Sequence, residues 1–284
     1  MSSNFSKAYI FGAGSVGRTI LHSVKSQYHV IAFLDNDDGK WSGTHEGLPV
    51  YSPESVMSTD YDAIVVATLA GVNSAVEQLL NLGVERSKIR TDYVDFTVRS
   101  RIVFLEKMGE MFHGQSINGC VAECGVFLGE FAREINRVFP TRKLYLFDTF
   151  SGFDKRDLLL EDKQQYSNFN TGHFSITSVE TVLNNLYYPE NCVFRKGYFP
   201  QTAEGLDESF CFVNLDFDLY QPTLAGLDYF FPRLVDKGII LVHDYFSNNY
   251  KGVMEAVKDF EHKTKGVRML PIGDGLSMCI FRHG

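Results

Sequence analysis

Several features that would place a chain in a large class of proteins are missing from these 284 residues. No apolar run approaches the ~20 residues that a membrane-spanning helix needs, so we expect no membrane partner. The N-terminus, MSSNFSKAYIFGAG, reaches a predicted strand almost at once, so we expect no signal peptide. The five cysteines form no C-x-x-C pair and have no histidine partner at metal spacing. They therefore indicate reduced thiols in a cytoplasmic protein.

An excess of basic residues, which nucleic-acid-binding proteins usually have, is also absent. The formal net charge is -8. Residues 1–96 carry 7 basic and 11 acidic side chains, and the rest of the chain carries 20 and 24. Because neither part has a basic surplus, we expect no nucleic-acid partner. What the chain does have is length and apolar material, at 44% hydrophobic residues, which predicts two domains.

Strands alternate with helices from residue 1 to residue 96. The stretches KAYIF, HVIAFLD and DAIVVAT are typical of buried strands, and helices are predicted from Ser15 through Ser26 and over NSAVEQLLNLG. This alternation predicts a Rossmann-like parallel sheet. Between the second and third strands, GLPVYSPESV holds two prolines, and we expect a loop that leads to a short helix.

A glycine loop follows the first predicted strand. GAGSVG places Gly12, Gly14 and Gly17 at the G-x-G-x-x-G spacing before a helix, and Asp35 ends the next strand. Backbone amides at such a helix start can bind a diphosphate, and the acid can bind a ribose hydroxyl. The region through GLPVYSPESV resembles nucleotide-binding Rossmann modules found beside sugar-modifying enzymes, which implies a nucleotide, nucleotide-sugar or NAD(P) ligand. The alternative, that the glycines only allow tight packing, stays open.

Residues 97–116 predict a connecting helix, because Ile102, Leu105, Met108 and Phe112 recur at helical intervals. Residues 117–284 then form a second domain, in which strand-like stretches again alternate with helices. Its last segment, VRMLPIGDGLSMCIFR, predicts a β-hairpin. The long segment RDLLLEDKQQYSNFNTGHFS, which includes His173, is expected to form a cover over the substrate. The aromatic run LDYFFPRL is expected to pack in the core.

Acidic residues gather at predicted strand ends of this second domain. Asp216 and Asp218 lie two residues apart in FVNLDFDLYQPT, so strand alternation predicts that both side chains point the same way. Like charges that close together need either solvent or a cation. Glu123 precedes a turn containing Gly125, and Asp148 ends the next strand, where ligands of open α/β sheets bind. These positions suit a cofactor with a carboxylate and an adenosine.

Five motifs in fixed order carry a family resemblance. VAECGVFLGEFA, LFDTFSGF, KGYFPQT, LDFDLYQPTLAGLDYFFPRL and GIILVHDY resemble the macrocin O-methyltransferase family, over the region from Ile117 to the C-terminus. Members of that family are S-adenosylmethionine-dependent, metal-requiring enzymes that methylate sugar hydroxyls. The resemblance implies a class I methyltransferase fold with a C-terminal hairpin for the second domain, so we expect an α/β chain of two Rossmann-like domains. It also implies a small-molecule sugar acceptor in polysaccharide or glycosylated metabolite synthesis, and a homo-oligomer is possible.

The resemblance also implies roles for particular residues. Asp216 and Asp244 would hold magnesium, His243 or Asp218 would complete the metal shell, and Asp216 could also act as general base. His243 stands where the family frequently has a second aspartate. The expected S-adenosylmethionine site comprises Glu123, Gly125, Gly129, Asp148, Thr149, Phe150, Ser151 and Gly152.

Two other functions remain as alternatives at this point. An NAD-linked sugar oxidoreductase would use the glycine loop at Gly12, but none of the 14 tyrosines has a lysine four residues on, as a short-chain enzyme would require. A non-catalytic nucleotide sensor or scaffold would not use the acids Asp216 and Asp244 for chemistry. The oxidoreductase alternative requires binding of a pyridine nucleotide, and the sensor or scaffold alternative predicts that replacing Asp216 and Asp244 with alanine changes no activity.

Overall fold

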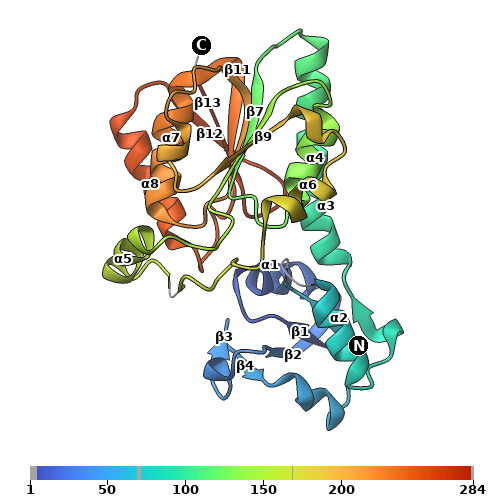
Figure 1. Cartoon of the computed structure of the whole chain (residues 1–284). Helices are drawn as coiled ribbons and strands as arrows, with labels where there is room; N and C mark the ends of the chain where they lie inside the picture. The colour runs from blue at the N-terminus through green and yellow to red at the C-terminus, as the bar shows by residue number, and fades with distance from the viewer. Residues whose placement is uncertain (1–4, 69–71, 168, 283–284) are drawn as a thin grey trace. The chain divides into compact units, whose positions relative to one another are not determined.

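The computed structural model describes residues 5–68, 72–167 and 169–282. Its contacts divide the chain into two compact units, Met1–Ser100 and Arg101–Gly284. Each unit is built around one sheet (Figure 1). The division lies between residues 96 and 117, the two boundaries predicted above.

The first unit has a six-stranded sheet in the order β3-β4-β2-β1-β5-β6, parallel except for the pair β3 and β4. The strands are β1 Ser6–Phe11, β2 Tyr28–Leu34, β3 Thr44–His45, β4 Leu48–Tyr51, β5 Ala63–Val66 and β6 Ile89–Arg90. The helices are α1 Ser15–Val24 and α2 Val72–Asn81, with short 3₁₀ turns η1 Asp38–Lys40, η2 Pro53–Met57 and η3 Arg86–Lys88. Successive β1 side chains alternate between two apolar clusters: Ile10 packs with α1, and Tyr9 packs with α2. The sheet is therefore covered on both faces.

The prediction of a loop over GLPVYSPESV was wrong in part. Its first residues form β4, which pairs with β2 through Val50 opposite Phe33. Val50 is buried, and that burial favours a strand where the prolines suggested a loop. Pro49 is tolerated because proline can occupy strands close to a sheet edge, and only the two-residue strand β3 lies beyond β4. The short helix expected next is the 3₁₀ turn η2.

Helix α3, Asp92–Gly114, contains most of the predicted connecting helix and begins earlier than expected. Two features explain the early start. Asp92 and Asp95 in its first turn interact favourably with the helix dipole, and Val94 is buried in the core of the first unit. Further along, Leu105 and Phe112 are fully buried in the core of the second unit, as their spacing predicted.

The second unit has a seven-stranded sheet in the order β12-β13-β11-β10-β7-β8-β9, in which only β13 is antiparallel to its neighbours. The strands are β7 Cys120–Cys124, β8 Leu144–Asp148, β9 Cys192–Lys196, β10 Phe210–Leu215, β11 Leu234–Val242, β12 Val267–Pro271 and β13 Met278–Arg282. The helices are α4 Glu130–Val138, α5 Lys155–Gln164, α6 Val179–Asn185, α7 Tyr220–Phe230 and α8 Lys251–Lys263, with 3₁₀ turns η4 Pro189–Asn191, η5 Gln201–Ala203 and η6 Phe231–Arg233. The strands β12 and β13 are the predicted C-terminal hairpin.

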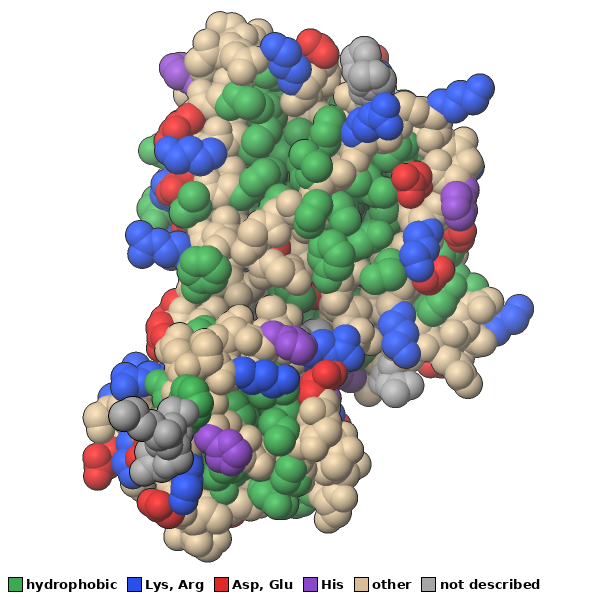
Figure 2. All heavy atoms as spheres, turned by 180° about the vertical axis from the view of Figure 1, so that it is seen from behind, with side chains coloured by type: hydrophobic (Ala, Val, Ile, Leu, Met, Phe, Trp, Pro, Cys, Tyr) green, Lys and Arg blue, Asp and Glu red, His purple; other side chains and the backbone are tan. Residues whose placement is uncertain are grey.

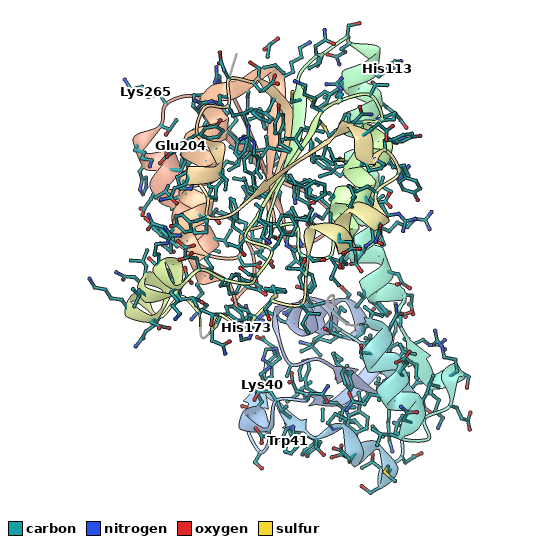
Figure 3. The ribbon with its side chains drawn as sticks, viewed as in Figure 1. Lys40, Trp41, His113, His173, Glu204 and Lys265 are labelled. Atoms are coloured by element: carbon teal, nitrogen blue, oxygen red, sulfur yellow. The ribbon has the colours of Figure 1, made fainter. Side chains whose placement is uncertain are left out.

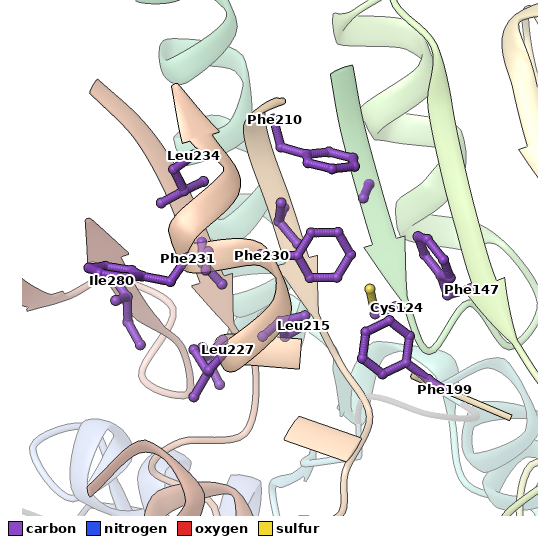
Figure 4. Packing of buried hydrophobic residues seen from close by; sticks show 14 of the residues in the cluster. Cys124, Phe147, Phe199, Phe210, Leu215, Leu227, Phe230, Phe231, Leu234 and Ile280 are labelled. Carbon is purple, nitrogen blue, oxygen red and sulfur yellow. The ribbon is translucent and has the colours of Figure 1, made fainter. Parts of the chain in front are cut away.

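Helices cover both faces of this second sheet. Alternate strand residues face opposite clusters: Ala122 packs toward α7 and α8, and Val121 packs toward α3 and α4. The ring of Phe230 lies 5.0 Å from that of Phe210 and 5.9 Å from that of Phe199, measured between centroids (Figure 4). The aromatic run therefore packs in the core, as predicted.

Charged side chains of both signs are interspersed on the face shown in Figure 2. In residues 5–68, 72–167 and 169–282, no helix is both long and apolar enough to cross a membrane.

Candidate active site

The acidic residues predicted at strand ends meet at the carboxyl edge of the second sheet. Asp216 directly follows β10, and His243 and Asp244 directly follow the adjacent parallel strand β11. One ligand atom from each of these three residues lies within 4.8 Å of the other two. The Nδ1 atom of His243 is 2.8 Å from Asp244 Oδ2 and 3.1 Å from Asp216 Oδ1.

Asp218 does not follow the strand geometry expected from the sequence. The strand β10 ends at Leu215, and Asp218 has a φ of +65°, in the left-handed region. The alternation that predicted a shared direction for Asp216 and Asp218 therefore does not extend to Asp218. Asp244 also has a positive φ, of +57°. Non-glycine residues in this conformation are uncommon and tend to cluster at functional sites.

Charges within the cluster control its protonation. Burial alone would raise the pKa of Asp216, but the positive charges of His243 and Arg101 outweigh burial and hold that pKa below its usual value. Burial and Arg101 oppose a charged His243, but the two neighbouring carboxylates prevail and raise its pKa to about 10. Burial, followed by the charges of Asp216 and Asp244, raises the pKa of the Asp218 carboxyl well above its usual range. The acids of this cluster are therefore balanced by two internal cations, Arg101 and protonated His243.

This donor set fits a divalent cation. Carboxylate oxygens from Asp216 and Asp244 are the ligands that Mg²⁺ prefers, and Mg²⁺ keeps waters in its other positions. An imidazole also binds first-row transition metals, so His243 widens the range of ions that fit. His243 must release its proton before Nδ1 can serve as a ligand.

The glycine turn after β7 is shaped by close backbone contacts. A Cβ atom on Gly125 would lie 2.0 Å from the backbone oxygen of Asp216, and Gly125 has a φ of +83°. Gly129, at the N-cap of α4, also has a positive φ. Only a glycine at position 125 allows the turn to approach the backbone of Asp216 this closely. The turn thus lies directly against the residue that follows β10.

Asp148 joins this turn to the end of β8. Its Oδ2 atom accepts hydrogen bonds from the backbone amides of Val126 (2.7 Å) and Phe127 (3.0 Å). Its Oδ1 atom accepts one from the amide of Phe150 at 2.6 Å. The carboxylate predicted to bind a ribose therefore also orders the two loops around it.

A cavity of about 390 Å³ lies beside these loops. Three of the expected cofactor residues, Thr149, Ser151 and Gly152, line it, together with Lys155 and Tyr198. Thr149 Oγ1 donates a hydrogen bond to the backbone oxygen of Gly152 at 2.6 Å, which holds the loop closed on itself. This volume is in the range of small-molecule and cofactor sites.

Two residues of the site were missed at the sequence level. Arg101, from α3, donates from Nη2 to Asp216 Oδ2 at 2.9 Å and to Asn214 Oδ1 at 3.0 Å. Asn214 in turn donates from Nδ2 to Glu123 Oε1 at 3.2 Å. Glu123 is only 2% exposed, and burial raises its pKa well above the usual value. No local motif marks Arg101, because its partners lie more than a hundred residues away in sequence.

The glycine loop of the first unit is explained by packing. A Cβ atom on Gly12 would meet the backbone oxygen of Ala67 at 2.7 Å, and one on Gly17 would meet that of Gly12 at 2.1 Å. Gly14 is the N-cap of α1, and its backbone oxygen lies 3.1 Å from His45 Nε2. These contacts agree with the packing alternative.

Asp35 already has hydrogen-bond partners within the first unit. It accepts hydrogen bonds from the amide of Ala13 (2.8 Å) and from Lys40 Nζ (3.0 Å) at Oδ2, and from the amide of Asp37 (2.9 Å) at Oδ1. Lys40 and its neighbour Trp41, which donates to the backbone oxygen of Asp35, are labelled in Figure 3. The described residues of this unit contain no buried side-chain polar atom that lacks a partner. A nucleotide or NAD(P) site here stays a prediction.

The segment expected to cover the substrate begins with helix α5, which the sequence did not predict. Buried Glu161 explains its position, because Oε1 accepts a hydrogen bond from the amide of Tyr220 at 2.8 Å and Oε2 accepts one from Ser167 at 3.0 Å. His173, labelled in Figure 3, accepts a hydrogen bond at Nδ1 from the amide of Asn170 at 3.2 Å. Its role at the substrate stays a prediction.

Comparisons with known proteins agree with this architecture. A sequence model described as macrocin-O-methyltransferase matches residues 87–275, which is more than half of the chain, and one described as the C2185-like N-terminal domain matches residues 4–90. No curated protein matches the chain. The O-methyltransferase NovP is similar in structure, with a TM-score of 0.53 and 20% identity over 65% of this chain and 80% of NovP. The calicheamicin methyltransferase CalS11 has a TM-score of 0.52 and 20% identity over 76% and 88%. At these identities the likeness shows the fold.

Proposed function

This chain belongs to the macrocin O-methyltransferase family and is an S-adenosylmethionine-dependent O-methyltransferase, and we propose that it methylates a sugar hydroxyl with the help of a bound Mg²⁺ ion. The observation that carries the proposal is the cluster of Asp216, His243 and Asp244 at the carboxyl edge of the sheet. This cluster begins where the glycine turn at Gly125 contacts the backbone of Asp216. Donor and acceptor would therefore meet at one edge.

The reaction determines what the protein must do. When bound, S-adenosylmethionine supplies a methyl group on a sulfonium that is already activated, and Mg²⁺ supplies charge that lowers the pKa of a hydroxyl. The chain must then hold the donor and acceptor in line and remove the hydroxyl proton. The loops around Gly125 and Asp148 would orient the donor. Asp216 and Asp244 would hold the ion.

We assign proton removal to Asp218 in preference to Asp216, which the sequence offered as both ligand and base. Asp216 Oδ1 and Oδ2 lie beside His243 and Arg101, and these charges keep its pKa low, which makes it a weak base. Asp218 is not one of the three clustered residues but adjoins them through a hydrogen bond with Asp244, and burial and the charges of Asp216 and Asp244 raise its pKa well above the usual range. A bound divalent cation would favour the ionised form of Asp218, and in that form its carboxylate can accept the hydroxyl proton.

Two variants distinguish ligand from base. Asp216→Asn should weaken Mg²⁺ binding in calorimetry. Asp218→Asn should leave Mg²⁺ binding within about threefold but lower kcat by roughly 100-fold or more, the usual contribution of a general base. Equal loss of metal binding in both variants would make Asp218 a ligand.

The proposed activity is tested with the full-length protein, S-adenosylmethionine carrying an isotopically labelled methyl group, and a panel of free sugars and nucleotide-sugars. Transfer of label to a sugar, detected by mass spectrometry and abolished by a chelator, is the expected result. Binding of S-adenosylmethionine without transfer to any sugar or nucleotide-sugar would contradict the acceptor class. Transfer that persists in the chelator would contradict the metal. A nucleotide-sugar acceptor would also give the predicted N-terminal site a ligand.

A further inference from the structure

Five aromatic side chains form a row across the carboxyl edge of the second sheet. Phe153 follows β8, Phe127 lies in the glycine turn after β7, and Tyr250 lies between β11 and α8. Phe169 and Phe174 belong to the segment expected to cover the substrate, which we call the cover segment. The ring centroids are 5.1 Å apart for the pair Phe127 and Phe174, 5.4 Å for Phe153 and Phe174, 5.8 Å for Phe153 and Phe169, and 5.1 Å for Phe169 and Tyr250. All five residues are half-buried, so the aromatic row leaves apolar surface accessible where ligands of open α/β sheets bind.

Tyr250 is the member of the aromatic row that carries a polar group, and it lies at the acidic end of the row. The described residues give its hydroxyl no hydrogen-bond partner. Burial, followed by the charges of Asp218, Asp244 and Asp216, raises the pKa of the phenol above its usual value, so the hydroxyl lies within the field of all three carboxylates. A phenol, whose ordinary pKa is about 10, is protonated at neutral pH and can donate a hydrogen bond. The acidic site therefore has an uncommitted donor beside it.

The cover segment fixes the ring of Tyr250. The planes of the Tyr250 and Phe169 rings differ by only 19°, so the two rings are stacked. His173, labelled in Figure 3, packs edge-on against Phe169 with a centroid distance of 4.8 Å. At the start of the cover segment, Glu161 lies against the first turn of α8, because a Cβ atom on Gly252 would be 2.8 Å from Glu161 Oε1. The cover segment thus contacts the chain on both sides of the start of α8 and limits the directions that the Tyr250 ring can take.

A sugar ring matches the two kinds of surface found here. Its C–H groups form apolar faces, and its hydroxyls project from its edges. The negative face of an aromatic ring attracts polarised C–H groups. Small-molecule sites combine apolar and aromatic walls with a few placed polar groups, and the aromatic row with the Tyr250 hydroxyl has this composition. A sugar whose reacting hydroxyl reaches Asp218 would also be near Tyr250, because both groups lie at the same edge of the sheet.

We propose that Tyr250 binds the acceptor sugar, donating a hydrogen bond from its hydroxyl to a sugar oxygen while its ring contacts a C–H face, and that Phe169 positions the Tyr250 ring. The proposal rests on the sugar O-methyltransferase function proposed above. The competing explanation is that the aromatic row only packs the cover segment against the domain. That explanation requires the rings of Tyr250 and Phe169 but not the hydroxyl, so removing the hydroxyl alone separates the two.

The test is steady-state kinetics of the full-length protein and its Tyr250→Phe variant. The acceptor is the member of the panel of free sugars and nucleotide-sugars that the wild-type protein methylates fastest. Loss of the hydrogen bond should raise KM for this sugar by roughly 3- to 10-fold and leave kcat within about twofold, because it removes binding energy shared by the ground state and the transition state. The affinity for S-adenosylhomocysteine, measured by calorimetry, should stay within about twofold. An unchanged KM for the sugar would overturn the proposal.

Tyr188→Phe is the matched control, because it removes a hydroxyl from the same unit at the opposite edge of the sheet. Tyr188 precedes β9, is 40% exposed, and should leave KM, kcat and the affinity for S-adenosylhomocysteine unchanged when its hydroxyl is removed.

Variants of Phe169 test its positioning role. Phe169→Leu removes the stacked ring and should raise KM for the sugar by about the same factor as Tyr250→Phe. Phe169→Tyr keeps the ring and should restore the wild-type KM. A raised KM in both Phe169 variants, or in neither, would refute the positioning role.

Failure of this proposal differs from failure of the proposed function. If the wild-type protein methylates a sugar of the panel and Tyr250→Phe has the same KM for it, Tyr250 does not contact the acceptor and the sugar O-methyltransferase function stands. If no member of the panel is methylated, the acceptor class fails and this proposal fails with it.

Discussion

Replacing Gly125 with alanine tests whether the position of Asp216 after β10 depends on the glycine turn after β7. The new Cβ atom would lie 2.0 Å from the backbone oxygen of Asp216, so the loop after β10 must move. The positive φ of Gly125 adds about 1–2 kcal/mol of strain for any L-residue. Displacing a packed neighbour costs a further ~1–3 kcal/mol. The sum, roughly 2–5 kcal/mol, is the expected loss in free energy of unfolding of the second unit.

Gly205 provides a matched control within the same unit. Its φ of +71° imposes similar strain, but a Cβ atom there would have no heavy atom within 4 Å. Gly205→Ala should therefore lose only the ~1–2 kcal/mol of backbone strain. Urea unfolding followed by circular dichroism gives both values, and calorimetry gives the affinity for Mg²⁺. Gly125→Ala should also weaken Mg²⁺ binding, because Asp216 is displaced. Equal destabilisation by the two variants, with unchanged Mg²⁺ affinity, would refute the coupling.

Three further predictions concern pH, the metal and the core. Burial raises the pKa of Asp157 from its ordinary 3.8 to about 6, although the hydrogen bond from Tyr198 opposes this shift. The protonated Asp157 carboxyl therefore contributes most to stability below pH ~4, and this contribution is lost as the pH rises through 6. Asp157→Asn should therefore raise unfolding free energy above pH 6 by at most ~3 kcal/mol and change little at pH 4; a gain equal at both pH values would contradict the raised pKa. Arg101→Met should tighten Mg²⁺ binding to the cofactor-free protein about tenfold by freeing Asp216, and calorimetry showing weaker binding would count against this. Phe230→Ala should lower the free energy of unfolding by about 3–5 kcal/mol, because the ring is fully buried, and a loss under 1 kcal/mol in urea titration would contradict the described core.

Most of the fold could be predicted because its strands are continuous apolar runs. The segments around Val121, Leu146 and Val213 are buried on both faces of a parallel sheet, which leaves a clear signal in the sequence. The exceptions are segments whose structure depends on distant partners. Strand β4 forms because Val50 is buried beside β2, and α5 is held by contacts of Glu161 with Tyr220 and Ser167. The local amino-acid composition does not indicate such long-range contacts.

The residues of the candidate site differ in the same way, because some have a local sequence signal and others depend on distant partners. Asp216, His243 and Asp244 were found because each follows a recognisable strand, and adjacent parallel strands bring their ends together. Arg101 and Asn214 were missed for different reasons. Arg101 lies on a helix more than a hundred residues from its partners, and Asn214 is a single buried polar residue within an apolar strand. In both cases only the three-dimensional structure shows the network.

The proposed function depends most directly on a divalent cation at the ends of β10 and β11. The decisive measurement is calorimetric titration of chelator-treated protein with Mg²⁺ in the presence of S-adenosylhomocysteine, for the wild type and for Asp216→Asn and Asp244→Asn. We expect saturable binding at a single site in the wild type and a loss of at least ~10-fold in affinity in each variant. Undetectable Mg²⁺ binding by the wild-type protein, or equal affinity in all three proteins, would contradict a metal site formed by Asp216 and Asp244.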